Sequence, residues 1–397
     1  MGLETNKVKY RDSWRLLRLK ELCTRISDGV HFTPDYVSEG VPFISVKDIF
    51  DDKVNFEKCK YITKDAHKEL IKRCYPEKDD ILITKSGTIG RMALVPDKPE
   101  FSLFVSVALL KNKKDLISSK FLKYCLENFL SHINISQDIK GGLLKNFHLE
   151  DIRETLIPEV SLIEQQKIVT KIEELFSQLE NGKQQLLTAQ KQLKTYRQSL
   201  LKNAFEGKLT NPNLKAGELP KGWEMKKLGE VCGIVYGKGL PVKELKPFGY
   251  PVFGANGIIG FNDKFLFEEP KVLISCRGAA SGKINISPAK FYVTNNSLVL
   301  DIKKKDELNK NYLFYALSIA KKTRLVTGTA QPQVTINNAV ELEIPIPQLH
   351  EQKAIVAILE SKLTICEKIE ETIKTSLQQS ETLRQSILKK AFEGRLV

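Results

Sequence analysis

The most regular pattern of hydrophobic and polar residues lies between residues 157 and 210. Apolar residues recur there in alternating steps of four and three, from Ile168 to Leu200. This heptad spacing predicts one long helix with a seam that faces a partner helix. Ser161, three residues before a glutamate, is typical of a helix start, and Gly207 is typical of a helix end.

The same pattern occurs again at the end of the chain, where residues 344–397 align with residues 157–210 without a gap. Ile369 and Leu383 are expected to continue the seam in this second copy. Gly182 interrupts the first copy, where it either lets the facing helix approach closely or kinks the helix. We expect the two copies to pair as a coiled coil; the alternative is that each helix packs only against a globular body.

The residues before each helix repeat as well. Trp14 and Cys23 recur at the same spacing as Trp223 and Cys232. The repeat therefore covers a globular domain plus a helix, and the join is rich in Pro, Gly and Asn, which is typical of a linker. The expected divisions are a lead-in at 1–13, a globular domain at 14–156, a helical region at 157–210, a linker at 211–222, a second globular domain at 223–343 and a second helical region at 344–397.

Each globular half has the pattern of a mixed α/β (α+β) domain. Short runs of β-branched and apolar residues predict strands at 41–46, 80–84, 271–275 and 297–300, and helical patterns occur at 119–128 and 311–320. Polar loops that contain glycine follow two of these strands. These loops lie at 85–91 and 277–283, and further glycine-bearing loops lie at 140–146 and 327–333.

Charge and cysteine usage narrow the class of protein. The chain has 62 basic and 48 acidic residues, a net charge of +14, which favours a polyanionic partner. Its seven cysteines form no CxxC pair and no zinc spacing, so we expect free thiols in a reducing cytoplasm. The polar N-terminus is unlike a signal peptide, and no apolar run is long enough to span a membrane.

Catalytic and cofactor motifs are missing from the sequence. Gly278, Gly282 and Lys283 resemble a phosphate-binding loop, but the spacing is one residue short and no Ser or Thr follows the lysine. His350-Glu351 lacks the second histidine of a zinc-protease helix. The carboxylates and histidines form no evident triad. We therefore expect a non-catalytic chain that binds neither a cofactor nor a metal ion.

The repeated motifs resemble those of one known family. An Ile-Pro pair followed by Leu-x-Glu-Gln begins at residues 157 and 344, and Ala-Phe-Glu-Gly begins at residues 204 and 391. With the segments at 28–34 and 250–260, this arrangement resembles the DNA-specificity subunit of type I restriction–modification systems, over nearly the whole chain.

The resemblance implies a fold and a function. It implies two target-recognition domains related by pseudo-twofold symmetry, each of which reads one part of a bipartite site in double-stranded DNA. The two long helices would form an antiparallel coiled coil that acts as a ruler and docks two methyltransferase subunits, which carry S-adenosylmethionine and methylate adenine. Restriction subunits that use ATP and Mg²⁺ would join this complex.

Loop position and side-chain chemistry select the candidate site residues, because short polar and basic side chains on loops read base edges in the major groove. The DNA-binding candidates are Lys85, Ser86, Thr88, Arg91, Lys140, Lys145, Lys238, Asn256, Arg277, Lys283, Gln331 and Gln333. The partner-binding candidates, from the helix-end motifs, are Leu162, Gln165, Phe205, Leu349, Gln352 and Phe392. Two alternatives stay open: the specificity subunit of a type II-like restriction system, and a coiled-coil scaffold with no role on DNA.

Overall fold

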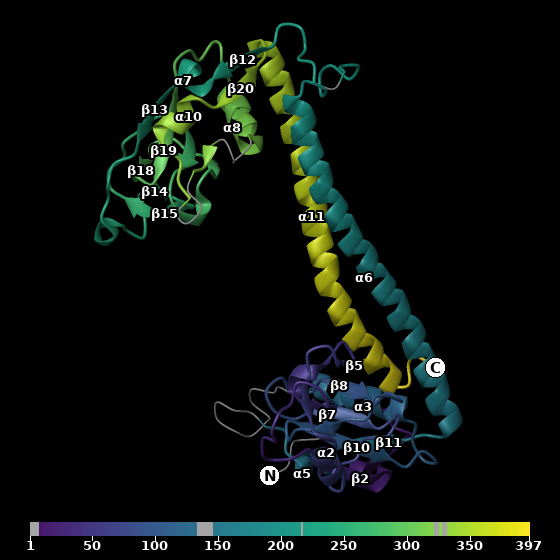
Figure 1. Cartoon of the computed structure of the whole chain (residues 1–397). Coiled ribbons are helices and arrows are strands. Elements are labelled where there is room, and N and C mark those ends of the chain that lie inside the picture. The colour runs from purple at the N-terminus through teal and green to yellow at the C-terminus, as the bar shows by residue number, and fades with distance from the viewer. Residues whose placement is uncertain (1–7, 133–145, 216, 321–324, 328–331) are drawn as a thin grey trace. The chain divides into compact units, whose positions relative to one another are not determined.

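The chain divides into two compact units in a computed structural model that describes residues 8–132, 146–215, 217–320, 325–327 and 332–397. Unit 1 is Met1–Leu186 with Thr375–Val397, and unit 2 is Leu187–Lys374. Each unit therefore contains one globular domain and part of each of two long helices, α6 (Leu162–Phe205) and α11 (Leu349–Phe392) (Figure 1).

The globular part of unit 1 is built on a four-stranded antiparallel sheet. In spatial order its strands are β2 (Cys23–Asp28), β10 (Val107–Asn112), β7 (Ile81–Thr84) and β8 (Met92–Leu94). All four residues of β7 are buried, as expected of an apolar strand covered on both faces. A smaller sheet has the order β6 (Lys60–Ile62), β3 (Val41–Ile44), β9 (Ser102–Leu103), with β3 and β9 parallel.

Short elements complete this domain. They are β1 (Arg15–Arg18), which pairs with β11 (Leu156–Glu159), the hairpin of β4 (Ile49–Phe50) and β5 (Lys53–Val54), and the helices α1 (Leu19–Leu22), α2 (Lys64–Ile71) and α5 (Leu149–Arg153).

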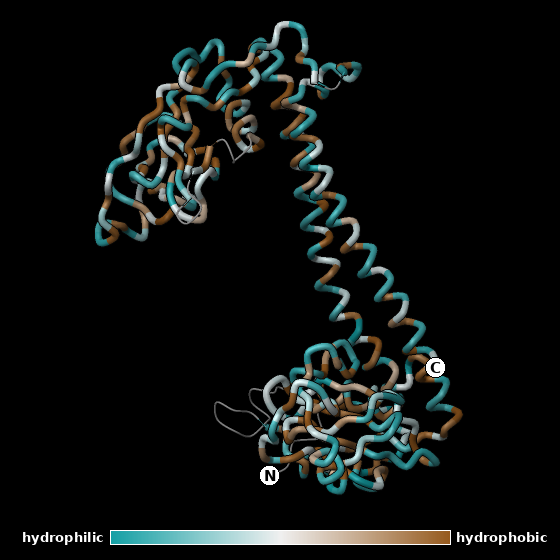
Figure 2. The backbone as a smooth tube through the Cα atoms, viewed as in Figure 1, coloured by the Kyte–Doolittle hydropathy of each residue, from teal (hydrophilic) through white to brown (hydrophobic). Residues whose placement is uncertain are grey.

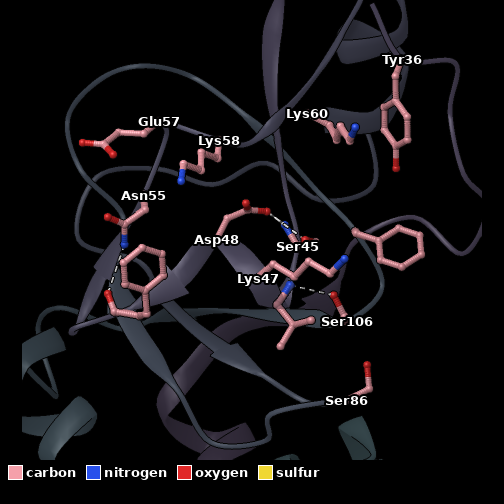
Figure 3. A pocket seen from close by; sticks show the side chains of 14 residues that line it. Tyr36, Ser45, Lys47, Asp48, Asn55, Glu57, Lys58, Lys60, Ser86 and Ser106 are labelled. Atoms are coloured by element: carbon pink, nitrogen blue, oxygen red, sulfur yellow. Dashed lines mark hydrogen bonds between the residues drawn. The ribbon is translucent and has the colours of Figure 1, made fainter. Parts of the chain in front are cut away.

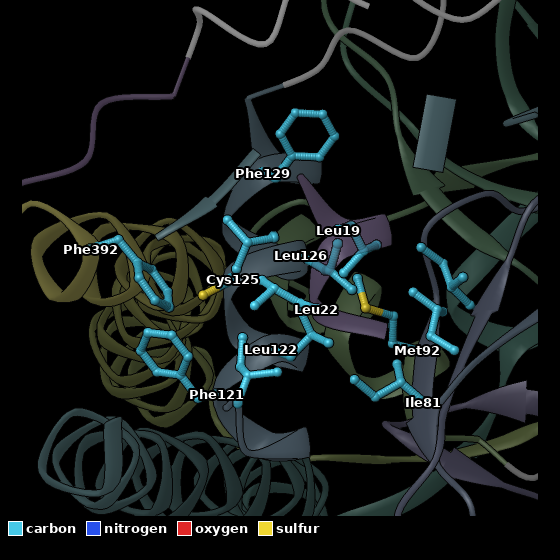
Figure 4. Packing of buried hydrophobic residues seen from close by; sticks show 14 of the residues in the cluster. Leu19, Leu22, Ile81, Met92, Phe121, Leu122, Cys125, Leu126, Phe129 and Phe392 are labelled. Carbon is cyan, nitrogen blue, oxygen red and sulfur yellow. The ribbon is translucent and has the colours of Figure 1, made fainter. Parts of the chain in front are cut away.

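Helix α3 (Ser119–Ser131) joins the sheet of unit 1 to the long helices. The Ser118 hydroxyl accepts a hydrogen bond from the Phe121 N–H at 3.2 Å, which satisfies one free donor at the start of α3. The rings of Phe121 and Phe392 lie 5.6 Å apart, so the end of α11 is part of the same core (Figure 4). Ile168 and Ile172, from the start of α6, belong to this core too.

Unit 2 repeats the topology of unit 1. Its main sheet has the order β13 (Cys232–Tyr236), β19 (Ser297–Ile302), β16 (Val272–Ser275) and β17 (Ile284–Ile286). Its smaller sheet has the order β15 (Gly257–Asn262), β14 (Tyr250–Gly254) and β18 (Tyr292–Val293), again with one parallel pair. The remaining elements are β12 (Glu224–Lys227) paired with β20 (Glu343–Ile346), and the helices α7 (Leu228–Val231), η3 (Val242–Glu244), η4 (Gly278–Ala280), α8 (Lys310–Ile319) and α10 (Ile336–Val340).

The long helices run antiparallel within each unit. In unit 1 the Arg384 guanidinium of α11 lies 4.1 Å from the centroid of the Phe176 ring of α6. In unit 2 Arg197 of α6 forms an ion pair with Glu370 of α11 at 2.7 Å.

Unit 1 also holds Ile168 and Phe392 in one core, and unit 2 holds Phe205 and Ile355 in another. In both units the residue numbers of the contacts therefore rise along α6 as they fall along α11. Hydrophobic and polar positions alternate along both helices (Figure 2), and the expected mixed α/β fold with two sheet-rich domains and an antiparallel helix pair is confirmed.

Two details of the seam differ from expectation. Ile369 is 44% exposed and Leu383 is 50% exposed, so the heptad series is not buried along its whole length. No atom lies within 4 Å of the position that a Cβ would take at Gly182, so close approach of a neighbouring helix does not require this glycine. Helix α6 also continues through Gly182 without a break.

Candidate nucleic-acid interface

In unit 1 the loop that follows β7 lies beside the chain that leads into α5. Ser86 forms a β-bridge with Asn146, and the Phe147 N–H donates to the Lys85 carbonyl at 2.7 Å. Gly87 has a φ of 73°, a left-handed conformation that favours glycine. Two segments that the sequence placed in separate loops are therefore joined by backbone hydrogen bonds.

Unit 2 makes the same arrangement from different residues. Arg277 forms a β-bridge with Gln333, and the Val334 N–H donates to the Cys276 carbonyl at 3.0 Å. Gly278 has a φ of 74°, almost the same as its counterpart in unit 1. Because the β-bridge and the backbone hydrogen bond are the same in both units, Arg277 of unit 2 is structurally equivalent to Ser86 of unit 1.

A hollow of about 720 Å³ adjoins the loop of unit 1. Three exposed lysines, Lys47, Lys58 and Lys60, line it together with the exposed ring of Tyr36 (Figure 3). The other lining residues are Ser45, Val46, Asp48, Phe50, Asn55, Glu57, Ser86, Gly87, Phe104 and Ser106. A wall that combines amines with aromatic rings can hold phosphates and stack on bases.

The hollow of unit 2 is smaller and more open to solvent, with a volume of about 560 Å³. Its polar side chains are Asn256, Arg277 and Lys283. The structure therefore brings together three candidates that lie on two separate loops of the sequence. Alanines and glycine form the rest of the lining, which leaves these three side chains to determine the chemistry.

Strand register places the two hollows at the same position in their units. Ile44 lies opposite Leu103 in the parallel pair of unit 1, and Phe253 lies opposite Val293 in the parallel pair of unit 2. Lys47 lies three residues after Ile44, and Asn256 lies three residues after Phe253, so Lys47 and Asn256 hold equivalent positions in the two units. The Arg91 carbonyl accepts a hydrogen bond from the N–H of Thr84, the last residue of β7. The Lys283 carbonyl accepts one from the N–H of Ser275, the last residue of β16, so Arg91 and Lys283 hold equivalent positions as well.

A buried ion pair lies below the loop of unit 1, and two exposed side chains also contact its carboxylate. Asp28 is buried and its carboxylate pairs with the Lys85 amine at 3.2 Å, with the Arg73 guanidinium at 3.0 Å and with the His31 ring at 3.3 Å. Burial acts to raise the pKa of Asp28, but the hydrogen bond and charge of Lys85, together with hydrogen bonds to His31 and Arg73, hold this pKa below its ordinary value. These contacts therefore keep a charged carboxylate under the loop.

Unit 2 replaces this ion pair with uncharged residues. Tyr236 stands in the register of Asp28, since each lies opposite the second residue of its central strand. Cys276 takes the place of Lys85, and burial raises the pKa of its thiol. The fold of the loop is thus the same with and without a buried ion pair beneath it.

The remaining DNA-binding candidates have varied settings. Thr88 and Lys238 are exposed, and Arg91 is exposed while its guanidinium donates to the Ile49 carbonyl at 3.4 Å. Lys85 is buried in its pair with Asp28, so its amine already has an intramolecular partner. Lys140, Lys145 and Gln331 lie outside the described residues.

The partner-binding candidates separate into buried and accessible side chains. Gln165 and Gln352 are buried, and each accepts a hydrogen bond at 2.8 Å from the backbone N–H of the residue that caps the nearby helix α3 or α8. Phe205 and Phe392 are also buried, in the cores of units 2 and 1. Leu162 is 44% exposed and Leu349 is half-buried, so these two offer surface to a partner.

Sequence reasoning did not single out the lysines of the unit 1 hollow. Lys58 and Lys60 occur in the stretch 56–61, where basic residues are interleaved with Phe and Tyr. Such interleaving is a recognised signal for nucleic-acid binding and could have marked this segment. Lys47 gave no signal, because only the return of the chain to the neighbouring sheet places it beside Ser86.

The described residues lack a metal site and a membrane span. No group of His, Cys, Asp and Glu there is placed to hold a metal ion. None of the helices in the described ranges has the length and apolar character needed to cross a membrane. All seven cysteines are free and buried.

Two units of one topology, each with one loop cluster and part of two long helices, define a class of protein with repeated domains. Comparison with known families agrees. The family model for the type I restriction modification DNA specificity domain matches residues 11–189 and 220–379. The chain belongs to this family: it is a specificity subunit of a type I restriction–modification system, a class of non-catalytic subunit that binds no cofactor itself.

Relatives and solved structures extend the match to the whole chain. The type I restriction enzyme EcoprrI specificity subunit of Escherichia coli is 28% identical over 78% of this chain and 78% of its own length. The HsdS subunit from Thermoanaerobacter tengcongensis shares the fold with a TM-score of 0.64, at 22% identity over 98% of both chains. A structure concerned with assembly and conformational transition of the type I R-M system has a TM-score of 0.76, at 23% identity over 98% of this chain and 100% of its own.

Proposed function

We propose that each unit reads one half of a bipartite target in double-stranded DNA through its loop hollow. The observation that carries this proposal is the equivalence of the two hollows, which share backbone geometry but differ in side chains. A shared frame with different lining residues is what two readers of different base sequences need. The net charge of +14 favours the same polyanion.

The helix pair would then set the gap between the two half-sites and dock two methyltransferase subunits. The exposed Leu162 and the half-buried Leu349, at the first residues of α6 and α11, are the docking contacts that we favour. S-adenosylmethionine would bind to the methyltransferase subunits, and ATP with Mg²⁺ to restriction subunits that join them. The solved structure that concerns complex assembly of the type I R-M system supports the assembly of this chain with other subunits.

Lengthening both long helices tests the ruler. A seven-residue insertion after Thr188 with a matching insertion in α11 keeps each seam in phase and adds roughly 10 Å of helix. Since base pairs are stacked about 3.4 Å apart, the gap should grow by at most about three base pairs while both half-sites keep their sequences. The measurement is the methylated motif in DNA from cells that express the complete system.

Two further results separate the alternatives. An active insertion variant with an unchanged gap would show that the spacing is set elsewhere. A gel shift of the chain with its methyltransferase partner on DNA that contains the parent motif distinguishes a DNA reader from a scaffold, because a scaffold would retard motif and scrambled duplexes equally or not at all.

A further inference from the structure

The hollow of unit 2 is lined by basic and amide groups without an acidic residue. Its seven lining residues are Ala255, Asn256, Arg277, Gly278, Ala279, Ala280 and Lys283. Arg277 and Lys283 are exposed, and no ion pair joins either of them to a carboxylate among the described residues. The positive charge of this hollow is therefore available to a ligand.

Hydrogen bonds inside the hollow determine which atom of the Asn256 amide is left to bind a ligand. The Lys283 amine donates to the Asn256 side-chain oxygen Oδ1 at 2.9 Å and to its backbone carbonyl at 3.4 Å. A lysine amine can only donate, so the amide oxygen faces the lysine and the amide Nδ2 is left as a donor. The guanidinium of Arg277 has donors and no acceptor. All three polar side chains thus offer hydrogen-bond donors to a ligand.

The backbone holds Arg277 in place before any ligand arrives. Its own β-bridge to Gln333 fixes one side, and the preceding Cys276 donates to the Asn296 carbonyl at 2.9 Å. The residue that follows, Gly278, begins the short helix η4. A reader whose main chain is fixed on both sides loses less conformational entropy on binding than one on a free loop.

The side-chain donors of this hollow favour a base edge with acceptors. Guanine presents two acceptors, N7 and O6, on its major-groove edge, whereas adenine and cytosine each present an amino donor there and thymine presents the single acceptor O4 beside a methyl group. An amino group facing Arg277 would meet another donor and leave both unpaired. An arginine fork matches the two guanine acceptors in a bidentate pair.

We propose that the unit 2 hollow reads a guanine, with Arg277 donating to its N7 and O6 and the Asn256–Lys283 pair donating to an adjacent acceptor of the same DNA. This inference rests on the proposed function and deepens it by naming the base. It applies to one half-site only, because Ser86 occupies the equivalent position in unit 1. A serine hydroxyl both donates and accepts, so it does not select guanine in this way.

The test uses the complete complex and variants of Arg277. The methylated motif of the wild-type system is sequenced first, and a bipartite motif establishes the proposed function independently of this inference. Arg277→Ala should relax a single G·C position in one half-site, with a loss of discrimination of roughly 5- to 150-fold at that position. Arg277→Lys keeps the charge but not the fork, so it should lose most of the same discrimination while it retains affinity for DNA.

Binding measurements on purified complex cover variants that methylate too weakly to sequence. Duplexes that carry each of the four base pairs at every half-site position are compared for wild-type complex and both variants. Lys305→Ala is the matched control, because it removes one positive charge from unit 2 at a side chain that pairs with Glu269 outside the hollow. A flattened preference at one guanine supports the proposal. Relaxation at an A·T position, a uniform loss over all positions, or full discrimination in Arg277→Lys would overturn it.

Discussion

Units 1 and 2 have the same strand order in both sheets but different chemistry beneath and within their hollows. Unit 1 places the ion pair of Asp28 and Lys85 under its loop, whereas in unit 2 the exposed Tyr236 and the buried Cys276 hold the equivalent positions. Gly87 of unit 1 and Gly278 of unit 2 share the same left-handed backbone conformation. The comparison teaches that backbone hydrogen bonds and glycine geometry shape the loop, while the side chains around it are free to differ in charge.

The largest effect is expected from breaking the buried ion pair of unit 1. Asp28→Asn leaves the buried Lys85 amine without a carboxylate, which should lower the free energy of unfolding of unit 1 by about 3–5 kcal/mol. Urea unfolding measures this loss. Asp65→Asn, which removes a carboxylate from an exposed pair with Lys68, should cost no more than about 1 kcal/mol.

The same variant has a defined dependence on pH. Because the pKa of Asp28 is lowered in the folded state, its stabilising effect is complete above the pKa of an unfolded aspartate and is lost as the pH falls through the folded value. The difference between parent and Asp28→Asn should therefore shrink on acidification. A double variant, Asp28→Asn with Lys85→Met, removes the unpaired buried charge with side chains of similar volume and should recover most of the stability. A single variant as stable as its parent would show that the pair is dispensable.

A smaller loss of stability, equal in the two units, is expected from replacing the buried glutamine that each unit has near the start of its long helix. Gln165 and Gln352 each accept one backbone hydrogen bond and donate two, to Leu116 and Val160 in unit 1 and to Glu307 and Pro347 in unit 2; these six bonds are 2.7–2.9 Å long. Replacement by Met leaves buried backbone groups unpaired, at a cost of about 1–3 kcal/mol in each unit.

Thermal unfolding of Gln165→Met and Gln352→Met checks this equality. Gln166→Met is the matched control, since Gln166 is exposed beside Gln165 and should change stability by less than about 0.5 kcal/mol. A loss of stability in only one of these two variants would show that the units differ where the globular domain meets the long helix.

A smaller effect is expected from two arginines that match in the helical repeat but differ in their contacts. Arg384 pairs with Asp52 at 3.0 Å and Glu127 at 3.4 Å and lies over the Phe176 ring, so it ties α11 to the globular domain. Arg197 pairs only with glutamates of α11 in the described contacts. Arg384→Gln should cost about 1–2 kcal/mol, and Arg197→Gln less than about 1 kcal/mol.

Hydrogen exchange of the backbone amides around each arginine measures the two costs separately. Faster exchange in the β4–β5 hairpin, which carries Asp52, is expected only for Arg384→Gln. Equal exchange in the two variants would contradict a stronger attachment of the helix in unit 1.

The sequence by itself determined the repeat, the long helices and four of the strands, β3, β7, β16 and β19. Heptad spacing and glycine stops are local signals, and they marked α6 and α11 to within a residue at Leu162 and Phe205. Runs of β-branched residues marked β7 and β16 in the same way. The loops after these strands were found too, because polar residues and glycine interrupt a buried pattern.

Only the tertiary structure decided which loop side chains are exposed and which are buried. Lys85 and Arg277 are the first basic residues of similar loops, yet Lys85 takes the buried position that Cys276 holds in unit 2, and Arg277 takes the next position, that of Ser86. Successive residues of an extended chain point to opposite sides, and only the strand pairing shows which loop residue stands at the buried position. Lys47 lines the hollow of unit 1 and Asn256 lines the hollow of unit 2. In each unit the smaller sheet brings this residue next to a loop that is formed by a later part of the chain.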